Sequence, residues 1–268
     1  MFIGLLVLIV ISLASAKPFN PKLDSTSSSE TRPKHVAKNR REPYVRWQHE
    51  PASNLILIAG QRHTIECEAA GSPPPKIHWL KNGRRIDQSG QAIYGNSEIV
   101  DSSESPELGL SLTKSKLSLG CVKPEDTGLY TCVAENNHEK IAAESQIKVL
   151  PSIESSPFSS YTECSLHESK KPSISMWTHT RLEKLDFPVI LYCRTDGRTD
   201  SSIKWINSDG RELNAFTADG KYDLLSTGDL LIRKVSWDDM GSYFCVAENQ
   251  YGQDKIESFL YPAQPDKQ

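Results

Sequence analysis

The chain has 268 residues, of which 37% are hydrophobic and 24% are charged, and its formal net charge is −3. A length of this order favours about two domains over one large core. The slight acidic excess gives no reason to expect a nucleic-acid partner, and we expect none.

The N-terminal segment has the features of a secretory signal peptide. Residues 1–16 read MFIGLLVLIVISLASA, an apolar run that ends in the small-x-small pattern Ala14-Ser15-Ala16. No later segment approaches the roughly 20 consecutive apolar residues that a membrane-spanning helix needs. We therefore expect a secreted, extracellular protein without a membrane span.

A basic segment follows, rich in Ser, Pro and Lys. Its composition predicts disorder over residues 17–42. Residues 17–46 hold eight Lys or Arg against three Asp or Glu, a net +5, so the chain from residue 47 onward carries −8. The pair Arg40 and Arg41 is a possible convertase site, but exposed basic runs are common in disordered tails, which favours a solvated linker. If the segment stays attached, residues 17–46 offer a surface for heparan-type polyanions.

The cysteines mark an internal repeat. Cys67 is followed twelve residues later by Trp79, and Cys193 is followed twelve residues later by Trp205. In a two-sheet sandwich a tryptophan on the next strand can pack against a cystine that crosses between the sheets. The repeat therefore predicts two similar β-sandwiches, each with a tryptophan in its core.

The second cysteine of each half ends the same D-x-G-x-Y-x-C string. The two strings contain Tyr130 before Cys132 and Tyr243 before Cys245. A tyrosine two residues before this cysteine is typical of a tyrosine corner, which belongs to the sandwich core. A secreted chain matures in an oxidising compartment, so the cysteines are expected to form disulfides. The repeat pairs Cys67 with Cys132 and Cys193 with Cys245.

These motifs resemble the immunoglobulin superfamily, of I-set or C2 type. The resemblance covers residues 43–150 and 173–263. It implies an all-β fold of two tandem immunoglobulin-like sandwiches after the signal peptide and basic segment. Residues 151–172 are then the linker, and 264–268 are a short tail.

Two of the six cysteines lie outside the repeat. Cys121 is expected at the end of a strand, at the pole where the chain leaves the first domain, and Cys164 lies in the linker. A bridge between them would fasten the linker to the first domain. The alternative is two free or intermolecular thiols.

No set of residues indicates catalysis. The seven histidines are scattered, and His78 should face away from Trp79 as a solvated side chain. Asp238 and Asp239 resemble a carboxylate pair, but Asp239 holds the turn position of the fold. No cysteines form a C-x-x-C pair that would suggest zinc. We expect a non-enzymatic protein with no cofactor and no metal.

Three segments of the second half, at 226–232, 236–245 and 258–262, resemble one family within the immunoglobulin superfamily. They read STGDLLI, SWDDMGSYFC and SFLYP. They are similar to the secreted zwei-Ig (zig) family of nematodes and to the insulin-binding imaginal morphogenesis proteins of insects, also called neural/ectodermal development factors. The extra pair Cys121 and Cys164 resembles the nematode branch.

The resemblance implies an extracellular binding protein that acts in the nervous system to maintain axon and neuron position, with a neuronal surface protein as its partner. An alternative is binding of insulin-like peptides that antagonises insulin signalling. A further alternative is a homophilic adhesion or matrix protein. A ligand could use an open sheet edge or an exposed sheet face, and the sequence favours neither. The acidic body would favour a basic partner.

Overall fold

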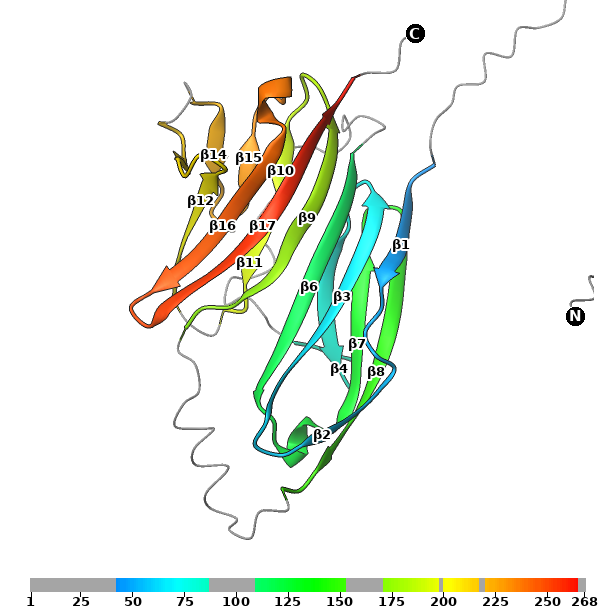
Figure 1. Cartoon of the computed structure of the whole chain (residues 1–268). Helices are drawn as coiled ribbons and strands as arrows, with labels where there is room; N and C mark the ends of the chain where they lie inside the picture. The colour runs from blue at the N-terminus through cyan, green and yellow to red at the C-terminus, as the bar shows by residue number, and fades with distance from the viewer. Residues whose placement is uncertain (1–41, 87–108, 153–170, 198–199, 217–219, 265–268) are drawn as a thin grey trace, which may run out of the picture. The chain divides into compact units, whose positions relative to one another are not determined.

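The computed structural model describes residues 42–86, 109–152, 171–197, 200–216 and 220–264 (Figure 1). They all belong to one compact unit, Arg40–Gln268. The expected signal peptide, the possible convertase site at Arg40 and Arg41, and Cys164 lie outside the described residues. Within those residues, no helix is long and apolar enough to cross a membrane.

The strands of the first half alternate inward apolar and outward polar side chains, as a half-exposed sheet requires. In β3, for example, Ile65 and Cys67 are buried while Glu66 is exposed. The described elements are β1 (Tyr44–His49), β2 (Asn54–Ile58), β3 (Arg62–Ser72), β4 (Lys76–Lys81), β5 (Arg84–Arg85), β6 (Leu110–Cys121), the 3-10 turn η2 (Pro124–Asp126), β7 (Gly128–Glu135) and β8 (Lys140–Leu150).

The second half repeats this order of strands and ends with the same 3-10 turn and hairpin. Its described elements are β9 (Ile174–Lys184), β10 (Val189–Leu191), β11 (Cys193–Thr195), β12 (Ser202–Asn207), β13 (Glu212–Leu213), β14 (Tyr222–Leu224), β15 (Leu230–Ile232), the 3-10 turn η4 (Trp237–Asp239), β16 (Gly241–Asn249) and β17 (Gly252–Ala263).

Each half is a sandwich with its own core. In the first, the sheet β2-β8-β7-β4-β5 packs against β1, β3 and β6. In the second, β10-β15-β14 packs against the sheet that contains β17, β16, β12 and β13. The prediction of two tandem immunoglobulin-like sandwiches is confirmed.

The two sandwiches share a sheet, which the sequence did not indicate. In the described residues a nine-stranded sheet follows the order β1-β3-β6-β9-β17-β16-β12-β13, with β11 paired to β9. Strand β9 of the second half pairs antiparallel with β6 of the first half and parallel with β17 (Figure 1). Without β9, strand β6 would be an open edge with unpaired backbone groups. The shared sheet therefore joins the halves by backbone hydrogen bonds.

Side chains support this junction from both halves. Lys116 of β6 forms an ion pair with Asp254 of β17 at 3.0 Å, and the same carboxylate accepts a 2.8 Å hydrogen bond from the backbone N–H of Ile174. Met176 of β9 packs into the core of the first half, where its Sδ lies 3.3 Å from the backbone nitrogen of Ile77. Strand β9 thus contributes to both cores.

Candidate ligand-binding site

Two disulfides cross the sandwiches. Cys67 and Cys132 join β3 to β7 with Cα atoms 6.7 Å apart, and Cys193 and Cys245 join β11 to β16 with Cα atoms 6.5 Å apart. Cys121, at the end of β6, is disulfide-bonded as well. Its expected partner lies outside the described residues, so the pairing with the linker cysteine remains a proposal.

The two tryptophans of the repeat are fully buried beside these bridges. The indole Nε1–H of Trp79 donates to Ser115 Oγ at 3.0 Å, and that of Trp205 donates to the Gly228 carbonyl at 2.9 Å. A buried indole N–H without an acceptor would carry a desolvation cost, so these bonds make the two positions compatible with tryptophan.

The two tyrosines of the repeat form the same local contact in each half. The hydroxyl of Tyr130 donates to the Asp126 carbonyl at 3.1 Å, and that of Tyr243 donates to the Asp239 carbonyl at 2.9 Å. Burial raises the pKa of Tyr243 well above that of a free tyrosine, because the ionised form would lose its hydration. These residues therefore serve the fold and not a ligand.

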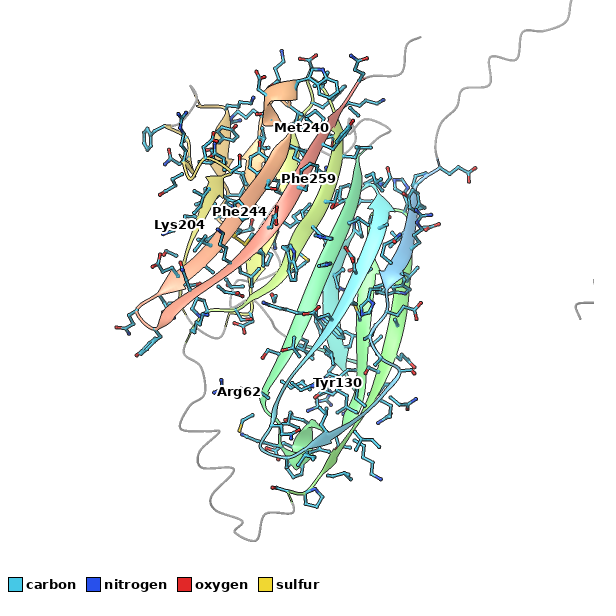
Figure 2. All side chains as sticks on the ribbon, viewed as in Figure 1. Arg62, Tyr130, Lys204, Met240, Phe244 and Phe259 are labelled. Atoms are coloured by element: carbon cyan, nitrogen blue, oxygen red, sulfur yellow. A yellow bond between two sulfur atoms is a disulfide. The ribbon has the colours of Figure 1, made fainter. Side chains whose placement is uncertain are left out.

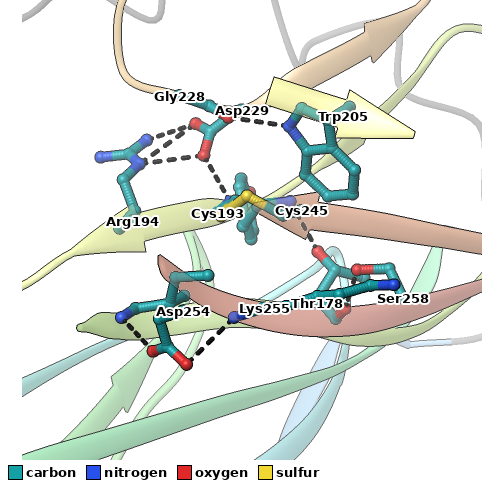
Figure 3. The surroundings of a disulfide bond; sticks show 12 residues. Thr178, Cys193, Arg194, Trp205, Gly228, Asp229, Cys245, Asp254, Lys255 and Ser258 are labelled. Carbon is teal, nitrogen blue, oxygen red and sulfur yellow. Dashed lines mark hydrogen bonds and ion pairs between the residues drawn. A yellow bond between two sulfur atoms is a disulfide. The ribbon is translucent and has the colours of Figure 1, made fainter. Parts of the chain in front are cut away.

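A buried carboxylate organises the turn next to the second disulfide (Figure 3). Asp229 accepts hydrogen bonds from the backbone N–H of Cys193 at 3.0 Å, from Arg194 at 2.6 Å and from Thr227 at 2.7 Å. Gly228 precedes it with φ +91°, and a Cβ there would lie 2.4 Å from Ile203. Only glycine fits this turn without displacement. The network is a satisfied structural element.

The residues that could have suggested catalysis are also part of the fold. Asp239 is buried, and its carboxylate accepts hydrogen bonds from Ser236 and Tyr222 and pairs with Lys221. His78 faces away from Trp79, as expected, but it is half-buried and not solvated. Burial, and then the charge of Arg85, lowers its pKa. Among the described residues, no three His, Cys, Asp or Glu side chains gather as a possible metal site.

The outer face of the shared sheet carries an unusual apolar surface. We call it the apolar row: Leu110 and Leu112 of β6, Leu182 of β9, and Phe259 and Tyr261 of β17. The register places Leu110 beside Leu182 and Leu182 beside Tyr261, so the row crosses the junction of the two halves. Phe259 is 39% exposed and Tyr261 44% exposed. The inward neighbour Leu260 is fully buried.

Polar and charged groups border this row. On β16 the neighbouring Phe244 lies under Lys255, whose Nζ is 4.0 Å from the ring centroid, and Figure 2 labels Phe244 and Phe259 on adjacent strands. Beyond Phe244, Lys204 pairs with Glu248 at 2.8 Å. An apolar centre with aromatic residues and a charged rim is typical of a protein–protein interface.

Sequence reasoning missed the apolar row, although the printed segment Ser258–Pro262 contains a signal. Phe259, Leu260 and Tyr261 are three consecutive large apolar residues, and on a strand they must point to both faces of the sheet. One face is the core, so the other had to expose aromatic side chains. The location of the row at the junction could not be inferred, because it depends on the pairing of β9.

The comparisons with known proteins agree with this architecture. An immunoglobulin-domain profile matches residues 42–136, and an immunoglobulin I-set profile matches residues 163–261. The crystal structure of neural ectodermal development factor IMP-L2 superimposes with a TM-score of 0.61 at 25% identity, covering 84% of this chain and 97% of that one. The fold defines a protein of two tandem immunoglobulin domains.

Two relatives found by sequence identify the family within this class of proteins. Zwei Ig domain protein zig-3 of Caenorhabditis elegans is 34% identical over 213 residues, which cover 80% of this chain and 79% of the relative. Neural/ectodermal development factor IMP-L2 of Drosophila melanogaster is 26% identical over 239 residues, covering 89% and 84% of the two chains. The chain belongs to the zwei-Ig family of two-immunoglobulin-domain proteins.

Proposed function

We propose that this is a secreted binding protein that takes up an extracellular protein or peptide on the apolar row. The observation that supports this most directly is the exposure of Phe259 and Tyr261 on a sheet face that both halves build together. Contiguous exposed apolar surface is disfavoured on a protein without a partner. The signal-peptide pattern of residues 1–16 supports secretion.

Within this class, the proposed role is in the nervous system, where binding to a neuronal surface protein maintains axon and neuron position. The likeness to zig-3 over most of both chains supports this role. The polar rim beside the row suits a protein surface, since interfaces combine an apolar centre with hydrogen-bonding groups at the edge.

A second candidate ligand is an insulin-like peptide, whose capture would antagonise insulin signalling. The likeness to IMP-L2 over both halves favours it, since it extends to 97% of that solved chain.

The test is binding of the purified mature protein to a panel of insulin-like peptides by surface plasmon resonance and to the surface of cultured neurons by immunostaining. A reduced, unfolded sample is the negative control. Nanomolar peptide binding establishes the hormone-binding candidate, whereas neuronal staining without peptide binding establishes the neuronal one. Binding to neither, with concentration-dependent dimers in size-exclusion chromatography, would replace both with a homophilic adhesion protein.

A further inference from the structure

The outer face of the sheet β2-β8-β7-β4-β5 carries a group of cationic side chains at one end. We call it the basic face: Lys76 and His78 of β4, Arg85 of β5 and Lys140 of β8. Lys76, His78 and Leu80 alternate with the core residues of β4, so they share the side that faces away from the core. Arg85 pairs with Leu80, and the register places Lys76 beside Glu135 and Glu135 beside Lys140. The basic face therefore extends across the neighbouring strands β5, β4, β7 and β8.

The carboxylate of Glu135 lies among these cationic groups. Its Oε1 is 3.4 Å from Nδ1 of His78, and its Oε2 is 3.5 Å from Nζ of Lys140. Lys76 and Arg85 form no ion pair within the part of the chain that the structure describes. The described residues thus leave two fixed positive charges on this face without an ion-pair partner.

The pKa of His78 reflects the balance of charge on this face. Burial lowers the pKa most, and the positive charge of Arg85 lowers it more than the carboxylate of Glu135 raises it. Lys140 lowers the same pKa further. The charges around the imidazole therefore sum to a positive potential in spite of the adjacent carboxylate, and this potential attracts anions.

The sign of this charge is opposite to that of the rest of the chain. Residues from 47 onward carry a net charge of −8. An outward position on a strand needs only a side chain that tolerates water, and a neutral polar residue meets that need as well as a cation does. The fold therefore does not explain why cations gather at this end of the sheet, whereas an anionic partner does.

The basic N-terminal segment joins the fold at the same end of the sheet. The turn 136–139 connects β7 to β8, directly before Lys140. The backbone N–H of Val45 on β1 donates to Glu139 Oε2 of this turn at 2.7 Å. Residues 17–46, which carry a net charge of +5, thus meet the fold beside this turn. The two basic regions are therefore neighbours at one end of the first half.

We propose that the basic face binds a sulfated polysaccharide of heparan type. The sulfate groups of such a polymer are permanently negative, and its length lets it contact the fixed cations of the basic face together with residues 17–46. The ligand of the proposed function lies elsewhere, on the shared sheet, which is the opposite sheet of the first sandwich. The polysaccharide therefore holds the protein near cells while the apolar row stays available to its own ligand.

The test is binding of the purified mature protein to immobilised heparin by surface plasmon resonance at about 0.15 M salt. The variant Lys76→Gln/Arg85→Gln removes the two cations without ion-pair partners and should weaken binding by at least about fivefold. The matched control, Lys148→Gln/Arg211→Gln, makes the same change in net charge at exposed positions outside the basic face, and its affinity should change less than about twofold. Heparin stripped of its sulfate groups should not bind the wild-type protein.

Equal affinity of the two double variants for heparin would overturn the site, because residues 17–46 and net charge would then account for binding. Absence of heparin binding by the wild-type protein would overturn it too. Segment 87–108 holds five Asp or Glu and no Lys or Arg, and heparin binding that appears only after these acidic residues are neutralised would assign the basic face to that segment instead. Binding of Lys76→Gln/Arg85→Gln to insulin-like peptides and neurons should stay at the wild-type level, so this proposal and the proposed function can fail separately.

Discussion

Tyr243 shows how a single hydroxyl supports the second sandwich. Its hydrogen bond to the Asp239 carbonyl is buried, and a buried bond of this kind contributes about 1 kcal/mol. We therefore expect Tyr243→Phe to lower the free energy of unfolding by about 1 kcal/mol in urea titrations followed by fluorescence. Tyr261→Phe, which changes an exposed hydroxyl on β17, should leave this free energy unaltered. Equal effects of the two substitutions would contradict the assignment.

Substitution of Asp229 is expected to lower the free energy of unfolding more than Tyr243→Phe does. Asp229→Ala removes the acceptor for a backbone N–H, a hydroxyl and a guanidinium at once. Loss of one partner from a buried ion pair costs about 3–5 kcal/mol. The side chain of Arg194 is 27% exposed and can regain water, so we expect the lower end of that range in the same urea titration. A loss below about 1 kcal/mol would show that water replaces the carboxylate.

At this scale the sequence was informative wherever a residue type is required by the fold. The disulfide cysteines, the two core tryptophans and the two corner tyrosines occur at repeated spacings, because each must fit one position in a sandwich. The environment of His78 could be predicted only in part. Alternation gave its face correctly, but its surroundings depend on neighbouring strands, which supply Glu135 at 3.4 Å from its Nδ1 and the charge of Arg85.

Strand β9 is the element on which the architecture depends. It pairs with β6 on one side and β17 on the other, so the two halves should unfold together. Thr180 lies between Leu112 and Phe259 in these ladders. A proline there removes a backbone donor from a central strand at a cost of about 3 kcal/mol or more.

We expect the wild-type protein to melt in one calorimetric transition and Thr180→Pro to melt in two, because the substitution uncouples the halves. Thr180→Val keeps the backbone donor and the β-branched shape, so it should retain one transition. Two transitions in the wild-type protein would show that the shared sheet does not couple the halves.

Strand β9 lies at the start of the segment expected to form the second domain, residues 173–263, but its pairing with β6 of the first half could not be predicted. Which strands pair depends on packing between segments that are distant in the sequence. In addition, the register of β9 against β6 is irregular, because Leu112 pairs with Thr180 whereas the next residue, Thr113, pairs with Thr178. The linker length did not specify whether the second half would lie apart from the first or against it. The apolar row could not be predicted either, because it forms only when β9 pairs with both β6 and β17.

The whole molecule adds a long-range electrostatic effect. Residues from 47 onward carry a net charge of −8, so a basic ligand should be attracted before contact. The association rate of such a ligand should fall several-fold between about 0.05 and 0.5 M salt, while the dissociation rate changes less. Surface plasmon resonance at several salt concentrations measures both rates. A salt-independent association rate would remove electrostatic steering from the account.

Binding of the ligand on the apolar row can be tested with one pair of substitutions. Phe259→Asp places a charge in the row, and Leu224→Asp places the same charge on β14, in the other sheet, at a site of similar exposure (39% and 41%). The measurement is affinity for the insulin-like peptide panel and for neuronal surfaces. We predict at least about tenfold weaker binding for Phe259→Asp and wild-type binding for Leu224→Asp. Wild-type affinity in a folded Phe259→Asp protein would contradict the claim.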